Sequence, residues 1–139
     1  MQVEHRIAIQ ATPEVIYRIY EDVGAWHTWD PDTKAATLDG PLRVGASGRL
    51  VPTKGRAVPM LVTQAVHARN FTVESRIPMF RMLFEHLLSP NGSGTEVVHR
   101  VTFSGFLSFI LGPLLSKQLH AGLPVTLSKL KHLAERNAA

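Results

Sequence analysis

The first ten residues alternate between two faces, one of which carries Val3, His5, Ile7 and Ile9. A period of two is typical of a half-buried β-strand. The next segment, Thr12-Pro13-Glu14, supplies a hydroxyl N-cap, a proline at the first helical position and an acid in the first turn. The pattern therefore predicts a strand and then a short helix. The buried side of that helix is expected to consist of Val15, Ile16, Ile19 and Val23.

Turn signals divide the middle of the chain into short strands. A second short helical or irregular segment is expected around residues 26–31, because Pro31 disfavours helix at the residue before it. From about residue 33 to residue 105 the spacing of the turns predicts six consecutive antiparallel strands connected as a meander. The turn signals are Asp39-Gly40-Pro41, Lys54-Gly55, Ala68-Arg69-Asn70, Pro78 and Pro90-Asn91-Gly92-Ser93-Gly94.

After Gly105 the hydrophobic period changes to that of a helix. One apolar stripe steps by four residues and once by three, and it predicts a long C-terminal helix over much of residues 107–136. Pro113 and Pro124 should bend or divide this helix, because proline lacks the N–H of the helical ladder. The stripe consists of Leu111, Leu115, Leu119, Leu123, Leu127, Leu130 and Ala134.

The order of elements predicts an α+β fold in a single domain, residues 1–139. A curved antiparallel sheet of about seven strands, with two short helices after the first strand, must bury one apolar face. The C-terminal helix is the only element long enough to cover that face. The space between sheet and helix is then either filled by side chains or left as a ligand cavity.

Short motifs follow one another in a set order: Ile7 to Val15, Asp22 with Trp26 and Trp29, Gly45, Gly94-Thr95-Glu96-Val97, Gly105, and Leu127 to Glu135. In this order they resemble the START-related helix-grip superfamily, and best its polyketide cyclase/dehydrase-like branch of small bacterial proteins. The resemblance covers essentially the whole chain. It implies a hydrophobic pocket between sheet and helix, and activities that range from carrying lipids to cyclising polyketides. That branch shares no universal catalytic residue, so no residue's role is carried over.

The turn Pro90-Asn91-Gly92-Ser93-Gly94 sets the register of the last hairpin. With Pro90 opposite Thr95, His86 lies opposite His99, on the more apolar and therefore concave face. The other face pairs Glu85 with Arg100, which predicts a surface ion pair. Further pairs expected on the concave face are Met82 with Phe103, Phe84 with Val101, and Leu88 with Val97.

A ligand pocket is expected where this face meets the C-terminal helix. His5 is included because the first strand should lie beside the last, which brings His5 toward His99. The expected pocket residues are His5, Trp29, Met82, Phe84, His86, His99, Val101, Phe103, Leu119 and Leu123.

The histidines of this face have three interpretations. Three neutral imidazoles can bind zinc or copper, yet no ligand pair has tight local spacing and no carboxylate shares the layer, so no metal and no cofactor is expected. Alternatively, the histidines contact a ligand, or each satisfies a partner within the core. His86 and His99 are the candidate catalytic residues, because a desolvated histidine stays neutral at pH 7 and can accept a proton.

Two aromatic or methionine-rich segments also allow two interpretations each. Trp26 and Trp29 either line the mouth of the pocket or plug the sheet edge beside the short helices, and the rigid Asp30-Pro31 favours the plug. A second group of residues, made of methionines and one phenylalanine, forms either an adaptable pocket wall or ordinary core. That set is Met60, Met79, Phe80 and Met82.

Composition narrows the class of protein. The absence of cysteine among 139 residues excludes disulfides, thiolate metal sites and thiol nucleophiles. The net charge of +4 lies mainly in residues 43–56 and 117–136, away from the aromatic residues, so a nucleic-acid partner is not expected. The N-terminus lacks the apolar stretch of a signal peptide and no apolar run spans a bilayer. We expect a cytoplasmic protein without stable membrane insertion, as a monomer or homodimer.

These features favour a binding or transport protein for a small hydrophobic molecule such as a lipid, a polyketide or another aromatic or isoprenoid compound. The alternative is an enzyme, a cofactor-free polyketide cyclase or dehydratase of the lyase or isomerase type that uses His86 and His99. A third hypothesis is a partner-binding module whose pocket is filled by its own side chains.

Overall fold

The computed structural model describes residues 1–139 and has the predicted order of elements. The helices are α1 (Pro13–Glu21), the 3-10 helix η1 (Val23–Thr28) and α2 (Ser108–Ala138). The strands are β1 (Gln2–Ile9), β2 (Thr33–Leu38), β3 (Ser47–Pro52), β4 (Val58–Val66), β5 (Asn70–Ile77), β6 (Phe80–Asn91) and β7 (Gly94–Ser104).

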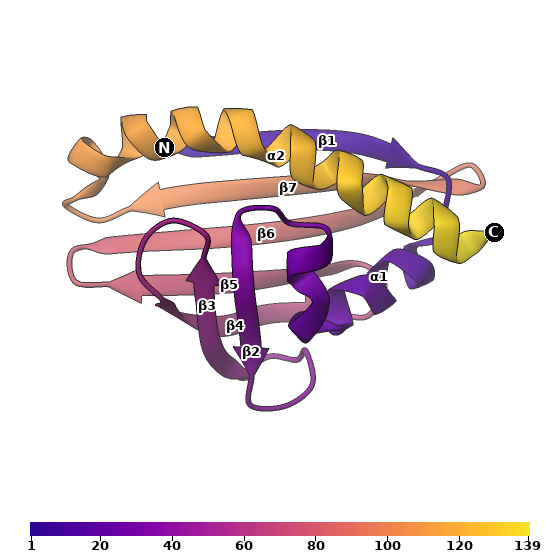
Figure 1. The fold of residues 1–139 in the computed structure, drawn as a ribbon, viewed down its shortest axis with the longest axis horizontal. Coiled ribbons are helices and arrows are strands. Elements are labelled where there is room, and N and C mark those ends of the chain that lie inside the picture. Colours follow the sequence, from indigo (N-terminus) through magenta and orange to yellow (C-terminus); the bar gives the residue numbers. More distant parts are fainter.

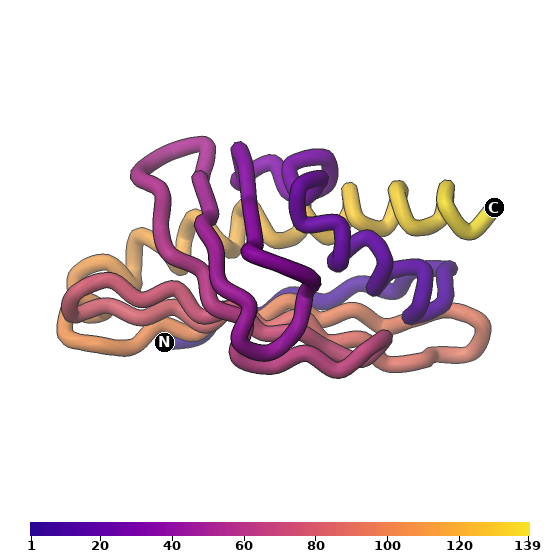
Figure 2. The backbone as a smooth tube through the Cα atoms, turned by 90° about the horizontal axis from the view of Figure 1, so that it is seen from below, coloured from indigo at the N-terminus to yellow at the C-terminus, as the bar shows by residue number.

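All strands form one antiparallel sheet in the order β1-β7-β6-β5-β4-β3-β2. The first strand lies beside the last, as expected. Figure 1 shows α2 crossing one face of this sheet along the β1 and β7 side. In Figure 2, β2 and β3 rise out of the plane of the long strands toward the side that carries α2. The predicted α+β helix-grip fold is confirmed.

Helix α1 begins as its sequence predicts. The Thr12 hydroxyl accepts a hydrogen bond from the amide of Val15 at 3.4 Å, and Pro13 opens the helix. The buried face differs from the predicted stripe, because it includes Tyr17 and Tyr20 beside Ile16 and Ile19. The two tyrosines bring polar groups into the core.

The predicted register of the β6–β7 hairpin is confirmed. Pro90 pairs with Thr95 and His86 with His99, while Phe84 pairs with Val101. On the opposite face the Arg100 guanidinium lies 3.3 Å from the Glu85 carboxylate. Because side chains alternate along a strand, this register fixes which residues of β6 and β7 face α2.

Helix α2 is continuous from Ser108 to Ala138 although it contains Pro113 and Pro124. The prolines therefore do not divide it, and Figure 1 shows it changing direction near its middle. Gly45 lies in the turn before β3, with a φ of 93°. That left-handed conformation is one that glycine adopts without strain.

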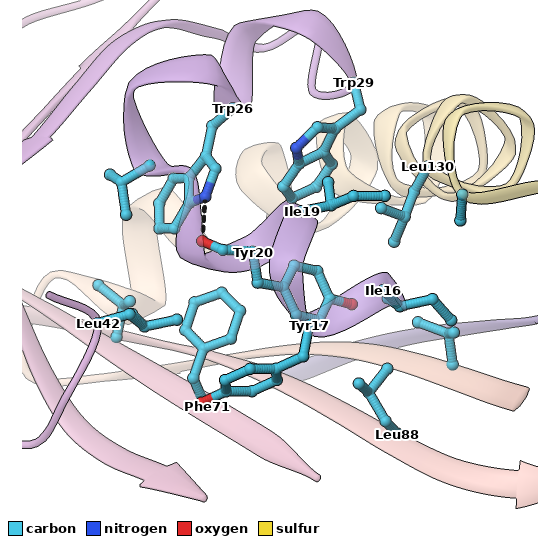
Figure 3. Close-up of a cluster of buried hydrophobic side chains, with 14 of the residues drawn as sticks. Ile16, Tyr17, Ile19, Tyr20, Trp26, Trp29, Leu42, Phe71, Leu88 and Leu130 are labelled. Carbon is cyan, nitrogen blue, oxygen red and sulfur yellow. Dashed lines mark hydrogen bonds between the residues drawn. The ribbon is translucent and has the colours of Figure 1, made fainter. Parts of the chain in front are cut away.

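The core has two parts. The larger part packs α1, η1 and the C-terminal half of α2 on the sheet around Tyr20, Phe71 and Leu130, as Figure 3 shows. The smaller part, around Val3, Val101 and Phe103, lies under the N-terminal half of α2. We call the larger part the closed core, because most of its side chains are fully buried. Many side chains of the smaller part are only half-buried.

Candidate functional site

A row of aromatic and imidazole side chains crosses the concave face. His5 of β1 pairs with His99 of β7, His99 with His86 of β6, and His86 with Phe71 of β5. Directly paired residues of an antiparallel sheet lie on the same face. The sequence predicted the neighbouring imidazoles of His86 and His99, whose ring centroids are 4.6 Å apart.

His99 is held by Tyr20, a residue that the sequence pattern did not indicate. The Tyr20 hydroxyl lies 2.8 Å from Nε2 of His99, and both residues are buried. Burial raises the pKa of Tyr20 well above its usual range. Burial, together with the neighbouring His86, lowers the pKa of His99 well below its usual range. Both groups are therefore uncharged at neutral pH.

His86 has one nitrogen engaged and one nitrogen available. Its Nδ1 lies 3.2 Å from the Phe71 carbonyl oxygen. A carbonyl oxygen only accepts, so Nδ1 carries the proton and Nε2 is left as an acceptor. The ring also stacks on Phe71, with centroids 3.9 Å apart and planes 3° from parallel. Burial lowers the pKa of His86 to about 4.

His5 turns away from the other two histidines and contacts the helix. Its Nε2 lies 2.9 Å from Nδ1 of His120, an exposed residue of α2. This bond joins β1 to the middle of α2. The histidines of β1, β6 and β7 thus do not converge on one point, and no three His, Cys, Asp or Glu side chains are grouped as a metal ion would require.

The concave face is open beneath the N-terminal half of α2. On β6, Met82 and Phe84 are only half-buried although they pack against the smaller core beneath the helix. His86 follows them on the same face of β6, half-buried beside Phe71 and Tyr20. The facing helix residues are also half-buried and pack against the smaller core: Leu111, Leu115, Leu119 and Leu123. We call the space between these two rows the concave groove. Of the predicted pocket residues, Val101 and Phe103 form its buried floor.

Two hollows on the surface lie outside this groove. One, of about 300 Å³, runs between α1, η1 and the end of α2, and its lining includes Arg18, Trp29 and Asn137. The other, of about 510 Å³, is formed by the turn between β2 and β3 around Arg43. Neither contains His86 or His99. The concave groove is defined by the half-buried side chains of β6 and α2.

A sequence profile decides the family. The profile described as polyketide cyclase/dehydrase and lipid transport matches residues 1–135. The chain belongs to this family.

Solved structures with the same fold are distant in sequence. A START superfamily protein from Mycobacterium smegmatis has a TM-score of 0.78 at 18% identity, over 97% of each chain. A di-domain ARO/CYC protein, StfQ of the steffimycin biosynthetic pathway, has a TM-score of 0.81 at 12% identity over 99% of this chain and 51% of its own. The Aha1 dimer from Colwellia psychrerythraea has a TM-score of 0.71 at 17% identity, over 100% of this chain and 99% of its own.

At such identities these structures establish the shared fold alone. No curated protein sequence matches the chain. No helix of this polyketide cyclase/dehydrase and lipid transport family member is both long and apolar enough to cross a membrane.

The two tryptophans of this family member lie in the closed core beside the groove. Trp26 is 7% exposed and its indole N–H donates to the Tyr20 carbonyl at 2.9 Å. Trp29 is 3% exposed, and its ring centroid lies 5.8 Å from that of Tyr20 and 6.3 Å from that of His99. This placement matches the packing interpretation. The Trp29 Nε1 atom is buried without a hydrogen-bond partner.

The segment after Trp29 is attached to α2. The Asp30 carboxylate accepts hydrogen bonds from the Thr33 hydroxyl at 2.8 Å, the Asp32 amide at 3.1 Å and the Thr126 hydroxyl of α2 at 3.2 Å. Burial nevertheless raises the pKa of Asp30. These bonds hold the tryptophan segment against the helix, between the closed core and the groove.

The proposed wall of methionine and phenylalanine is only partly formed. Met82 lies in the groove, and Met60 and Phe80 are buried in the two core clusters. Met79 was wrongly grouped with them, because it lies on the β5–β6 turn and is 62% exposed. The turn at Pro78 interrupts the strand alternation, so residue 79 no longer follows the period of β6.

Proposed function

We propose that the protein binds a small hydrophobic molecule, such as a lipid, a polyketide or another aromatic or isoprenoid compound, in the concave groove. One observation carries this proposal. Met82 and Phe84 pack against the core beneath α2 yet stay half-buried, as do the leucines of the helix that pack against the same core. Two apolar walls that do not close on each other gain free energy when a further apolar molecule fills the space between them.

The chemistry of the groove limits the ligand. His86 offers an uncharged acceptor nitrogen, Ser75 pairs with Met82 on the same face, and the neighbouring apolar cluster is aliphatic and aromatic. A ligand that is mostly apolar and carries a hydroxyl or another neutral donor at one point suits this lining, whereas a strongly charged ligand would lose hydration without a partner.

The binding test uses an uncharged fluorescent hydrophobic probe, Nile red, with displacement by long-chain alcohols and flat uncharged aromatic compounds. Phe84→Trp adds ring volume to the groove and should lower probe affinity about fivefold or more, equivalent to ~1 kcal/mol. Arg18→Ala, in the surface hollow beside α1, and Lys131→Ala, on the far half of α2, are the matched controls. Equal effects of Phe84→Trp and Arg18→Ala would place the probe outside the groove and reject the proposal.

A second candidate function is acid–base catalysis without a cofactor, as a polyketide cyclase or dehydratase. It is favoured by the contact of His86, which has a free acceptor nitrogen, with His99, which Tyr20 holds. In a cyclisation, Nε2 of His86 would take a proton from a carbon beside a carbonyl. The resulting enolate would attack the carbon of a second carbonyl to form the new carbon–carbon bond, and the His86 imidazolium would return the proton to that carbonyl's oxygen.

The two functions separate in one experiment. His86→Gln with His99→Gln should leave probe affinity largely intact if the groove only binds. If the histidines act on the substrate, the same double variant should keep binding and lose turnover of an aryl poly-β-ketone. Turnover by the native protein that persists in the double variant would exclude this pair as the catalytic groups.

A further inference from the structure

The outer face of the first half of α2 has no protein partner. Phe109 is 84% exposed, Phe106 and Ile110 are each 69% exposed, and Leu114 is 57% exposed. The opposite stripe of the same segment, which includes Leu111 and Leu115, faces the sheet. A helix that is apolar on both faces is normally covered on both. Here one face is covered by the sheet and the other is bare.

The β5–β6 turn extends this bare surface. The Leu107 amide donates to the Met79 carbonyl at 2.9 Å, which holds the turn against the β7–α2 loop. Figures 1 and 2 both place the turn and the loop at the same end of the molecule. We call the exposed apolar residues of this end the apolar tip: Ile77, Met79, Phe106, Phe109, Ile110 and Leu114.

Cationic groups surround the apolar tip. No residue from 104 to 116 is charged, and the next charge along α2 is Lys117. The adjoining hairpin carries Arg76 and Arg81, which share one carboxylate, Glu74, at 3.5 Å and 2.7 Å. A net positive charge remains on this side. Farther along α2 the basic residues Lys129, Lys131 and Arg136 outnumber the single acid, Glu135.

We propose that the apolar tip docks on the surface of an anionic lipid bilayer. Exposed phenylalanine, leucine and isoleucine beside basic residues fit the boundary between acyl chains and anionic headgroups. A second copy of the chain fits less well. A two-fold contact would place the tip against itself and bring Lys117, Arg76 and Arg81 of both copies together.

The location of the tip gives docking a consequence for the groove. The helix segment that carries Phe109 and Ile110 outside also carries Leu111 and Leu115 inside, over the concave groove. Docking therefore brings the groove next to the lipid, from which an apolar ligand would enter. This consequence alone rests on the proposed function. Docking itself does not.

Vesicle co-sedimentation of the full chain tests docking, with phosphatidylcholine vesicles and with vesicles that also contain phosphatidylglycerol. The native protein should bind the anionic vesicles, more weakly as salt rises. Phe109→Gln with Ile110→Gln should lower the partition coefficient about tenfold or more, because two large apolar side chains leave the interface. Lys117→Gln should lower binding to the anionic vesicles only.

The matched control is Val44→Gln with Val66→Gln, which removes two exposed apolar side chains outside the tip. Circular dichroism melting checks that both double variants fold, and Phe109→Gln alone repeats the test if the tip variant is destabilised. Three results would overturn docking: no binding of native protein to anionic vesicles, equal binding by tip and control variants, or equal binding to both vesicle types. A native dimer that the tip variant converts to a monomer, without vesicle binding, would reassign the tip to self-association. Probe binding without vesicles tests the groove separately.

Discussion

The hydroxyl of Tyr20 and Nε2 of His99 lie 2.8 Å apart in the closed core, and they join α1 to β7 across 79 residues of sequence. The bond leaves neither polar group unsatisfied, which matters because an unpaired buried polar atom costs more than a hydrogen bond contributes. It also fixes the imidazole beside His86. The pair therefore connects the packing of α1 with the polar end of the groove.

Replacing Tyr20 by phenylalanine should destabilise the fold. Tyr20→Phe removes the partner of Nε2 and leaves that atom buried, at a cost of about 1–3 kcal/mol. Tyr17→Phe is the matched control, because its hydroxyl donates to the Asn70 carbonyl at 3.1 Å in a less enclosed position. Urea unfolding followed by fluorescence measures both variants. If both variants lose the same free energy of unfolding, or Tyr20→Phe loses none, the buried hydrogen bond does not stabilise the fold more than the less enclosed one.

Stability should fall as the solution becomes acidic. Burial lowers the pKa of His86 to about 4 and lowers that of His99 as well. The unfolded chain, with histidine pKa values near 6.5, takes up protons first. The free energy of unfolding should therefore begin to fall as pH falls through about 6.5, and the fall should level off below the folded pKa values. His86 accounts for at most about 3 kcal/mol of this loss.

The control for this pH dependence is His86→Gln with His99→Gln, compared with native protein at each pH. The comparison is needed because Asp30, whose pKa burial raises, acts in the opposite direction. The double variant should show a flatter profile between about pH 6.5 and pH 4. Parallel profiles, or NMR titration giving both histidines pKa values at or above about 6.5, would contradict the buried neutral pair.

Removing the contact between Asp30 and α2 should loosen the tryptophan segment. Thr126→Val keeps the shape of the buried side chain and deletes the 3.2 Å bond to the Asp30 carboxylate. A loss of about 1–2 kcal/mol is expected in chemical unfolding. Thr28→Val removes an exposed hydroxyl that donates to the Ala25 carbonyl and should change stability much less. If the two variants unfold at the same denaturant concentration, Asp30 does not anchor the segment.

The sequence was sufficient to predict the register of the β6–β7 hairpin and the apolar stripe of α2 that faces the sheet. The turn at Asn91-Gly92-Ser93-Gly94 fixed the pairing of β6 with β7, so His86 and His99 were correctly expected as neighbours. Alternation is a strict rule once a turn is placed, and each strand face follows from it.

The sequence was insufficient where two distant elements meet. Tyr20 lies four residues after Ile16, on the buried side of α1, and that spacing was the available signal. No pattern within the α1 sequence specifies the angle at which α1 crosses the sheet. The contact between the Tyr20 hydroxyl and His99 could therefore not be predicted from the sequence. For the same reason His120 was missed as the partner of His5. The bare outer face of α2 was also missed, since the leucine stripe explained only its inner face.

Methyl NMR of the methionines tests the central claim, ligand binding in the concave groove, most directly. The chain has four methionines. Met82 lies in the groove, Met60 is buried in the closed core and Met79 is exposed on the β5–β6 turn. Met1 lies against Gly112 of α2, beside the groove, and is not used as a reference. In protein labelled with ¹³C at the methionine methyl groups and titrated with Nile red or a long-chain alcohol, the Met82 signal should shift and saturate while those of Met60 and Met79 move little. A saturating shift confined to Met79, with Met82 unchanged, would contradict binding in the groove.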